Sequence, residues 1–160
     1  MRHTMSCMVR NQPGVLEKLT RVLGNRSLNI HSLSVNESEE ENLSRVTVVI
    51  EGTREQLEMA TADIKELDVV ADVEDLDRRG FLDRELVLMK VKTQPEDLPR
   101  LMQIVEVMHA SVIAMGADNM TIEMTGTEEK ISGFIRLLRP FGIIEYARSG
   151  RVAVSTGGTK

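Results

Sequence analysis

The stretch Asn11-Gln12-Pro13-Gly14-Val15-Leu16 (NQPGVL) separates two different hydrophobic periodicities near the start of the chain. Before it, Met5, Cys7 and Val9 alternate with other residues, which is typical of a β-strand with one buried face. After it, apolar residues recur at helical spacing, namely Val15, Leu16, Leu19, Val22 and Leu23. Proline and glycine are residues that tight turns use. The stretch therefore predicts a turn that leads from a strand into a helix.

The rest of the first half predicts two strands, a helix and a fourth strand. Residues 28–35 and 46–50 have strand-like patterns, and the acidic run 36–42 between them predicts a hairpin turn. A capping-box pattern at 53–56 begins a helix whose apolar face consists of Leu57, Ala60, Ile64 and Leu67. A strand at 69–73 completes the order βαββαβ. This order predicts a ferredoxin-like fold, in which an antiparallel sheet carries two helices on one face.

The second half repeats the same order of elements. It predicts strands at 85–91, 111–115, 120–124 and 143–147, with helices at 98–108 and 127–138. The predicted fold class is therefore α+β, with two tandem ferredoxin-like βαββαβ domains. We expect the first domain at 1–77, a linker at 78–83, and the second domain at 84–160, ending in a short flexible tail. Because one face of such a sheet lacks helices, we also expect a homodimer that covers it.

Composition excludes several classes of protein. The net charge of −5 and the aromatic content of 2% argue against a nucleic-acid binder, and no basic patch suggests membrane association. A single cysteine excludes an internal disulfide framework and a cysteine-based zinc site. No signal peptide or membrane-spanning apolar run is recognisable, so we expect a cytoplasmic protein.

The sequence shows no obvious catalytic or metal-binding constellation. Cys7 is interpreted as a buried strand residue rather than a nucleophile. The acidic run 37–41 is interpreted as a solvated loop rather than a cation site, and Gly157–Lys160 as a frayed terminus rather than a phosphate loop. The three histidines lack metal-ligand spacing: His3, His31 and His109. We therefore predict no catalytic residues and no metal site.

The NQPGVL turn allows two interpretations. A helix that begins at about Gly14 exposes N–H groups and the positive end of its dipole, where a carboxylate can bind without a basic side chain. Gly14 permits close approach of a ligand to the backbone, and Asn11 offers an amide donor and a carbonyl acceptor. The same residues are also common in turns that bind nothing. Residue chemistry alone leaves both interpretations open.

A family resemblance favours ligand binding. The pattern Asn11-x-Pro-Gly-Val-Leu, followed by Asn25-Arg26-x-x-Asn29-Ile30-x-Ser32-Leu33-x-Val35 and by Leu43–Thr47, resembles an ACT domain. Together with Asp83–Val91 and Ile144–Gly150, it is similar to the small regulatory subunit of acetolactate synthase, also called acetohydroxyacid synthase. The resemblance covers nearly the whole chain. It departs from the family at Ser27-Leu28, where glycine and an aromatic residue are common.

The resemblance implies a subunit that has no catalysis of its own, forms a homodimer, activates a catalytic large subunit and conveys feedback inhibition by valine in branched-chain amino-acid biosynthesis. Residues 1–77 would be the ACT regulatory domain. The implied effector site combines the loop of one chain with the second strand of another; its residues are Asn11, Gly14, Val15, Leu16, Asn29 and Ile30. Thiamine diphosphate, magnesium and FAD would belong to the catalytic subunit, and this chain would carry no cofactor.

Three alternatives belong to other functional classes. A free-standing ACT-domain sensor that regulates another enzyme would share the loop motif. An independent enzyme would need Cys7 or a histidine as its reactive group. An RNA-binding module can share the βαββαβ order, but it normally stacks bases on aromatic side chains that the predicted central strands here lack.

Overall fold

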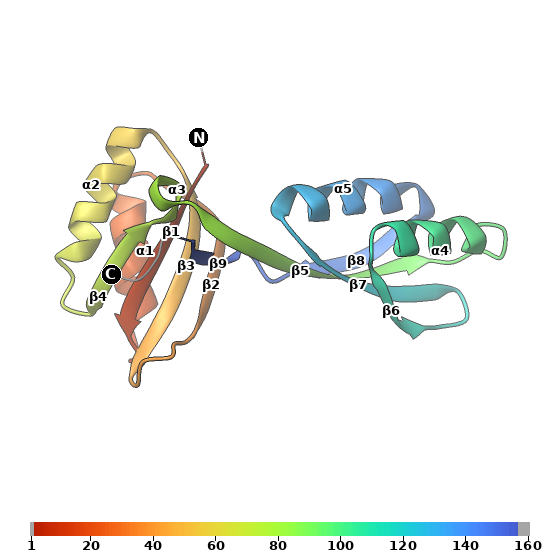
Figure 1. The fold of residues 1–160 in the computed structure, drawn as a ribbon, viewed down its shortest axis with the longest axis horizontal. Helices are drawn as coiled ribbons and strands as arrows, with labels where there is room; N and C mark the ends of the chain where they lie inside the picture. The colour runs from red at the N-terminus through yellow and green to blue at the C-terminus, as the bar shows by residue number, and fades with distance from the viewer. Residues whose placement is uncertain (1, 157–160) are drawn as a thin grey trace. The chain divides into compact units, whose positions relative to one another are not determined.

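The computed structural model describes residues 2–156 of the 160-residue chain. The chain forms two compact units (Figure 1). The first unit contains the residues up to Leu82 together with the segment that begins at Arg151, and the second unit contains Asp83–Gly150. Gly157–Lys160, which the sequence assigns to a frayed tail, lies outside the described residues.

The first unit has the predicted order of strands and helices. Its elements are β1 (Arg2–Arg10), α1 (Val15–Asn25), β2 (Asn29–Glu37), β3 (Leu43–Glu51), α2 (Arg54–Lys65), β4 (Val70–Asp75) and the short α3 (Leu76–Arg79). The sheet is antiparallel between neighbours, with strand order β2-β3-β1-β4. Helices α1 and α2 cover one face of it (Figure 1). The first predicted ferredoxin-like domain is therefore confirmed.

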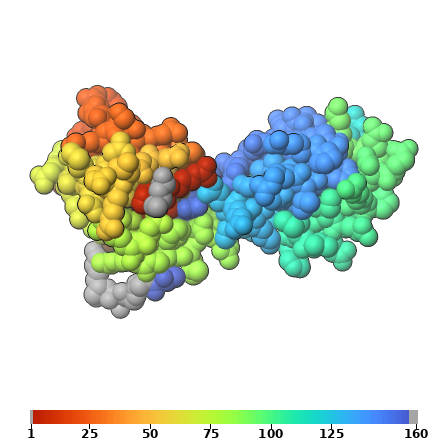
Figure 2. Space-filling view, turned by 90° about the horizontal axis from the view of Figure 1, so that it is seen from above, coloured from red at the N-terminus to blue at the C-terminus, as the bar shows by residue number. Residues whose placement is uncertain are grey.

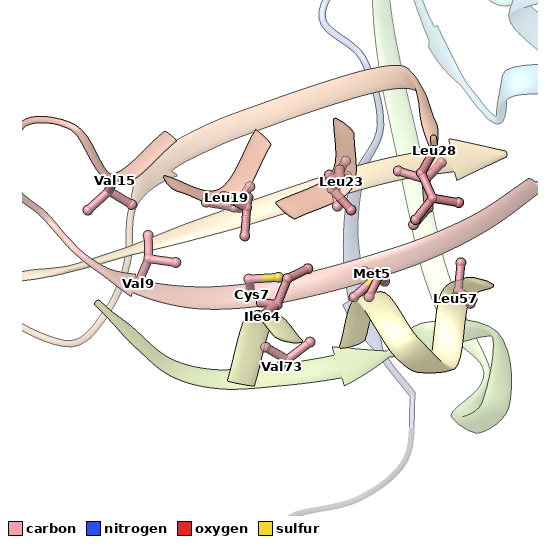
Figure 3. Close-up of a cluster of buried hydrophobic side chains, with 14 of the residues drawn as sticks. Met5, Cys7, Val9, Val15, Leu19, Leu23, Leu28, Leu57, Ile64 and Val73 are labelled. Atoms are coloured by element: carbon pink, nitrogen blue, oxygen red, sulfur yellow. The ribbon is translucent and has the colours of Figure 1, made fainter. Parts of the chain in front are cut away.

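The core of the first unit lies between the sheet and these two helices. Met5, Cys7 and Val9 of β1 belong to one buried cluster with Leu19 of α1 and Ile64 of α2 (Figure 3). All five side chains are fully buried or nearly so. Because strand side chains alternate between faces, the 2-residue period of β1 places this apolar row on the helix side. The core thereby fixes where β1 ends and the NQPGVL turn begins.

The opposite face of β1 is also largely buried, which differs from the predicted uncovered face. Thr4 is 1% and Ser6 is 4% exposed. The reason is that two arginine side chains cover them: Arg45 Nη1 donates to Ser6 Oγ at 3.3 Å, and Arg151 Nη1 donates to Thr4 Oγ1 at 2.6 Å. The polar residues of this face thus have partners within the chain.

The end of α1 forms a Schellman motif with serine at its left-handed position. Ser27 has φ 55°, its N–H bonds to Gly24 O at 2.9 Å, and the N–H of Leu28 bonds to Leu23 O at 3.0 Å. Ser27 is one of the two positions at which the sequence departs from the family it resembles. Its backbone conformation is one that favours glycine. This motif sets the direction in which the chain enters β2.

The second unit repeats the topology of the first. Its elements are β5 (Phe81–Lys92, whose first residues belong to the first unit), α4 (Leu98–Val107), β6 (Ser111–Met115), β7 (Asn119–Gly126), α5 (Glu128–Leu138), the 3-10 helix η1 (Arg139–Phe141) and β8 (Ile143–Arg148). The strand order β6-β7-β5-β8 is equivalent to that of the first unit. Helices α4 and α5 lie on one face of the sheet (Figure 1). The prediction of two tandem ferredoxin-like domains is confirmed.

The last described strand departs from the predicted domain boundary. Strand β9 (Val152–Ser155) pairs with β5, and its contacts group it with the first unit rather than with residues 84–150. Dark-blue atoms of this segment lie against red and green atoms of the first unit (Figure 2). The predicted linker 78–83 contains the end of α3, Gly80 with φ 76° and the start of β5. The chain therefore crosses between the units twice.

Replacing Ser27 by glycine should stabilise the protein. A left-handed non-glycine residue is strained by about 1–2 kcal/mol, and the greater freedom of glycine in the unfolded chain offsets about 0.4–1 kcal/mol of the relief. We expect the free energy of unfolding of Ser27→Gly to rise by about 0.5–1 kcal/mol in chemical denaturation. Ser34→Gly, within β2, is the control and should lower it, since glycine weakens a strand. A loss of stability in Ser27→Gly would contradict the assigned backbone conformation.

Candidate functional site

An open hollow of about 470 Å³ lies where β1 passes into α1. Its lining consists of Val9, Arg10, Asn11, Gln12, Pro13, Gly14, Val15, Leu16, Glu17, Val35 and Ser44. The four loop-side residues predicted from the family resemblance are all among them. The loop-side residues of the predicted site therefore line one hollow within a single chain.

The backbone at Gly14 makes this hollow suitable for an anion. Gly14 is the N-cap residue of α1 and has a left-handed conformation, with φ 84° and ψ −4°. Its carbonyl accepts the first helical hydrogen bond from the N–H of Lys18 at 3.2 Å, and no side chain caps the helix. A Cβ atom at Gly14 would have no atom within 4 Å. The first N–H groups of α1 thus border open space at the positive end of the helix dipole.

Side chains, rather than backbone groups, supply the other polar and apolar surface of the hollow. The side chain of Asn11 donates from Nδ2 to Glu37 Oε1 at 3.5 Å, and its backbone N–H bonds to Asn42 O at 2.8 Å. Leu16 and Val35 contribute apolar surface and are 39% and 37% exposed. Backbone donors, an amide with a nearby carboxylate, and apolar surface together match the three parts of an apolar α-amino acid.

Asn29 and Ile30 lie at the other end of the same sheet. Ile30 is paired with Ile50, which is paired with His3 near the beginning of β1. By contrast, Glu37 at the end of β2 is paired with Ser44, beside the hollow. At about 3.3 Å per residue, Asn29 is roughly 26 Å along β2 from Glu37. The six predicted residues therefore do not meet within one chain.

Other hollows in the first unit are of similar size. Two of about 480 Å³ each lie beside α2, α3 and β4. Their charged side chains largely pair with one another: Arg78 with Glu58 at 2.6 Å, Arg78 with Asp75 at 3.1 Å and Arg79 with Glu74 at 3.2 Å. Volume alone does not distinguish the three hollows. The uncapped start of α1 does, because it offers polar groups that the helix itself does not use.

Sequence reasoning did not predict the contributions of the neighbouring strands, namely Val35 and Ser44, which line the hollow, and Glu37, which accepts a hydrogen bond from Asn11. The signal was present in the predicted topology, because β1 and β2 are both antiparallel to β3 and so run parallel to each other. The carboxyl end of β2 must then lie at the same edge of the sheet as the carboxyl end of β1. Alternation along β2 and β3 selects the side chains that face the turn.

The cysteine and the histidines, which the sequence offers as possible catalytic groups, lie in separate environments. Burial, together with the nearby charge of Asp72, raises the pKa of the Cys7 thiol to about 12, so the thiolate is scarce at neutral pH. His31 Nε2 lies 2.7 Å from Glu51 Oε2, and His3 Nδ1 lies 3.9 Å from Asp77 Oδ2. Within residues 2–156, no three or more His, Cys, Asp and Glu residues form a group suited to a metal ion.

Three further observations concern the acidic loop, Arg148 and the helices. In the loop, Glu39 pairs with Arg45 at 2.8 Å, and the pKa of Glu39 lies below its usual value because a backbone hydrogen bond and the charge of Arg45 favour the carboxylate. Arg148, for which the sequence allows a carboxylate on another protein, pairs with the buried Glu85. None of the helices in the described part of the chain is long and apolar enough to cross a membrane.

Comparisons with known proteins agree along nearly the full length. Residues 5–72 match the family described as "AHAS small subunit-like ACT domain", and residues 84–157 match "Small subunit of acetolactate synthase". The probable acetolactate synthase small subunit of Archaeoglobus fulgidus is 35% identical over 160 residues, which cover 100% of both chains. The small subunit of Mycolicibacterium smegmatis is 35% identical over 155 residues, covering 97% of this chain and 91% of the relative.

A solved structure supports the same assignment. The acetolactate synthase small subunit of Thermotoga maritima has a TM-score of 0.91 and 32% sequence identity, with 99% of both chains covered. The fold and the family models define a protein with an ACT domain followed by a second ferredoxin-like domain. The chain belongs to the family of acetolactate synthase small subunits.

Proposed function

We propose that this chain is the regulatory, non-catalytic subunit of an acetolactate synthase and that it binds valine between the ACT domains of a homodimer. The observation that carries the proposal is the hollow at Gly14, where uncapped helix N–H groups meet the apolar side chains of Leu16 and Val35. Membership of the small-subunit family supplies the context.

The topology supports one way in which the two halves of the site would come together. Strand β2 is at the edge of its sheet and therefore has one side on which another strand can pair. Antiparallel pairing of two β2 strands around a two-fold axis near Leu33 would place Asn29 and Ile30 of one chain beside Val35–Glu37 of the other. The second copy would then close the hollow at Gly14.

Each part of valine would find a complementary group in this arrangement. The carboxylate would accept hydrogen bonds from backbone N–H groups between Gly14 and Leu16. The ammonium group would donate to the side-chain oxygens of Asn11 and of Asn29 from the second copy, with the Glu37 carboxylate close to Asn11. The isopropyl group would contact Leu16 and Ile30.

Regulation requires a partner that responds to the dimer. A ligand shifts an equilibrium only by its difference in affinity between two states, so valine inhibits only if the catalytic subunit distinguishes the two dimer arrangements. We infer that this partner is the large subunit, which would carry thiamine diphosphate, magnesium and FAD, and that the valine-free dimer activates it. The family relationship supports this partner.

Replacing Gly14 by aspartate should weaken valine binding. The introduced side-chain carboxylate would repel the carboxylate of valine at the helix terminus, so we expect the dissociation constant from isothermal calorimetry to rise at least about tenfold, which is about 1.4 kcal/mol. Gly14→Ala is the matched control, because it adds at least as much left-handed strain without charge and its Cβ has open space. Unchanged valine binding in Gly14→Asp would show that the site lies elsewhere.

The catalytic partner can be identified by co-purification. A tagged copy of this chain should capture a thiamine-diphosphate-dependent enzyme whose production of acetolactate rises when the chain is added and falls when valine follows. The control is the same experiment with Gly14→Asp, which should activate but should not convey inhibition. If the chain binds valine yet captures only itself, it is a free-standing sensor and the proposed partnership is wrong.

A further inference from the structure

The segment that returns from the second unit is anchored to the first unit by a set of specific contacts. Strand β9 pairs with β5, Ala153 is buried, and the N–H of Thr156 bonds to Gly80 O at 3.1 Å. Gly150 precedes the segment and has φ 77°. The segment is thus held on the first unit between Arg151 and Thr156.

Arg151 contacts two strands of the sheet in the first unit, β1 and β2. Its backbone N–H donates to Ser32 Oγ at 3.1 Å, and its guanidinium Nη1 donates to Thr4 Oγ1 at 2.6 Å. The guanidinium carbon also lies 5.7 Å from the centre of the Phe81 ring, within the range of a cation–π interaction. One residue therefore connects β2, β1 and the first residue of β5.

The two anchor points belong to one row across the sheet. Thr4 is paired with Val49 of β3, and Val49 is paired with Ser32 of β2. Adjacent strands are about 4.8 Å apart, so the row from Thr4 to Ser32 spans roughly 10 Å. Val49, in the middle, is 2% exposed although it faces away from the helices. Arg151 thus spans three strands on the face that α1 and α2 leave uncovered.

Ser32 lies next to the residues proposed to meet the effector. The pairing of β2 with β3 shifts between Ile30 and Ser32, which makes His31 an extra residue in β2. Asn29 and Ile30 precede this bulge, and Ser32 follows it directly. A strand bends at a bulge, and Ser32 is the first residue after this bend that is again paired with β3.

We propose that the Ser32–Arg151 contact couples the effector site to the chain segment that leads into the second unit. This inference rests on the proposed function, because it assumes that valine meets Asn29 and Ile30. Movement of β2 on valine binding changes the position of Ser32, and Arg151 transfers that change to residues 148–150. There, Ser149 Oγ accepts the N–H of Leu86 at 3.0 Å and its N–H bonds to Leu86 O at 3.0 Å, so the change reaches β5 of the second unit.

Ser32→Ala tests this coupling because it removes the acceptor without touching the proposed valine contacts. Two quantities are measured: the dissociation constant of valine by calorimetry, and the maximal inhibition of acetolactate production by the reconstituted complex with the large subunit. We expect the dissociation constant to stay within about threefold of the unmodified chain, too small a change to indicate a lost ligand contact, and maximal inhibition to fall to less than half. Arg151→Met keeps the backbone N–H that donates to Ser32 but removes the guanidinium that holds Arg151 on Thr4 and Phe81, so the weaker anchoring should also lower maximal inhibition.

Matched variants separate this role from a merely structural one. Ser34→Ala changes the next serine on the same face of β2, which is paired with Thr47, and should inhibit like the unmodified chain. Ser32→Thr keeps a hydroxyl and should restore inhibition. Circular dichroism melting of each variant verifies that it is folded, and the Arg151→Met variant provides the test if Ser32→Ala does not fold.

The outcomes distinguish this inference from the proposed function. If the unmodified chain does not bind valine, the proposed function fails before the contact is tested. If the unmodified chain binds and inhibits, but Ser32→Ala and Arg151→Met inhibit equally well, the coupling role is overturned. If Ser32→Ala loses binding together with inhibition, Ser32 belongs to the effector site itself and the coupling role is again overturned.

Discussion

Gly14 turns the chain from β1 into α1 through a left-handed backbone and leaves the first turn of α1 without a side-chain cap. That turn can be placed only where β1 stops, and β1 stops where its row of core residues, Met5, Cys7 and Val9, ends beneath the two helices. The hollow beside the turn is therefore a consequence of the core. Its polarity comes from the backbone, so it needs no charged side chain to attract a carboxylate.

The two halves of the proposed site lie at opposite ends of the edge strand β2. The loop at Gly14 is beside the end of this strand, and Asn29 and Ile30 are at its beginning. An edge strand that pairs with its own copy in an antiparallel sense brings its beginning next to its end, so the separation of Asn29 from Glu37 favours a site shared by two chains. Such a site links ligand binding to dimer geometry. In the proposed coupling, the hydrogen bond from the Arg151 N–H to Ser32 connects that geometry to the chain segment that leads into the second unit.

Much of the fold could be predicted from local pattern. The alternation in β1, the NQPGVL turn and the capping box at 53–56 each depend on residues close in sequence, and the same order of strands recurs in the second half. The contacts of Arg151 with Ser32 and of Arg148 with Glu85 span 119 and 63 residues, and no periodicity indicates them. For the same reason local pattern does not predict the burial of Thr4 and Ser6. Asn29 and Ile30 are predicted as site residues from the family resemblance alone. The exposed start of a strand has no distinctive local sequence pattern that would indicate a binding site.

The central claim is that each effector site takes its loop from one chain and its strand from another. Gly14→Asp and Asn29→Ala each damage one side, and neither homodimer should bind valine well. When the two variants are unfolded and refolded together, a mixed dimer contains one site with both defects and one intact site. Calorimetry should then show strong valine binding at about a quarter of the normal number of sites, since half of the dimers are mixed in random assembly. If the mixture binds no better than the separate variants, the site is not shared in this way.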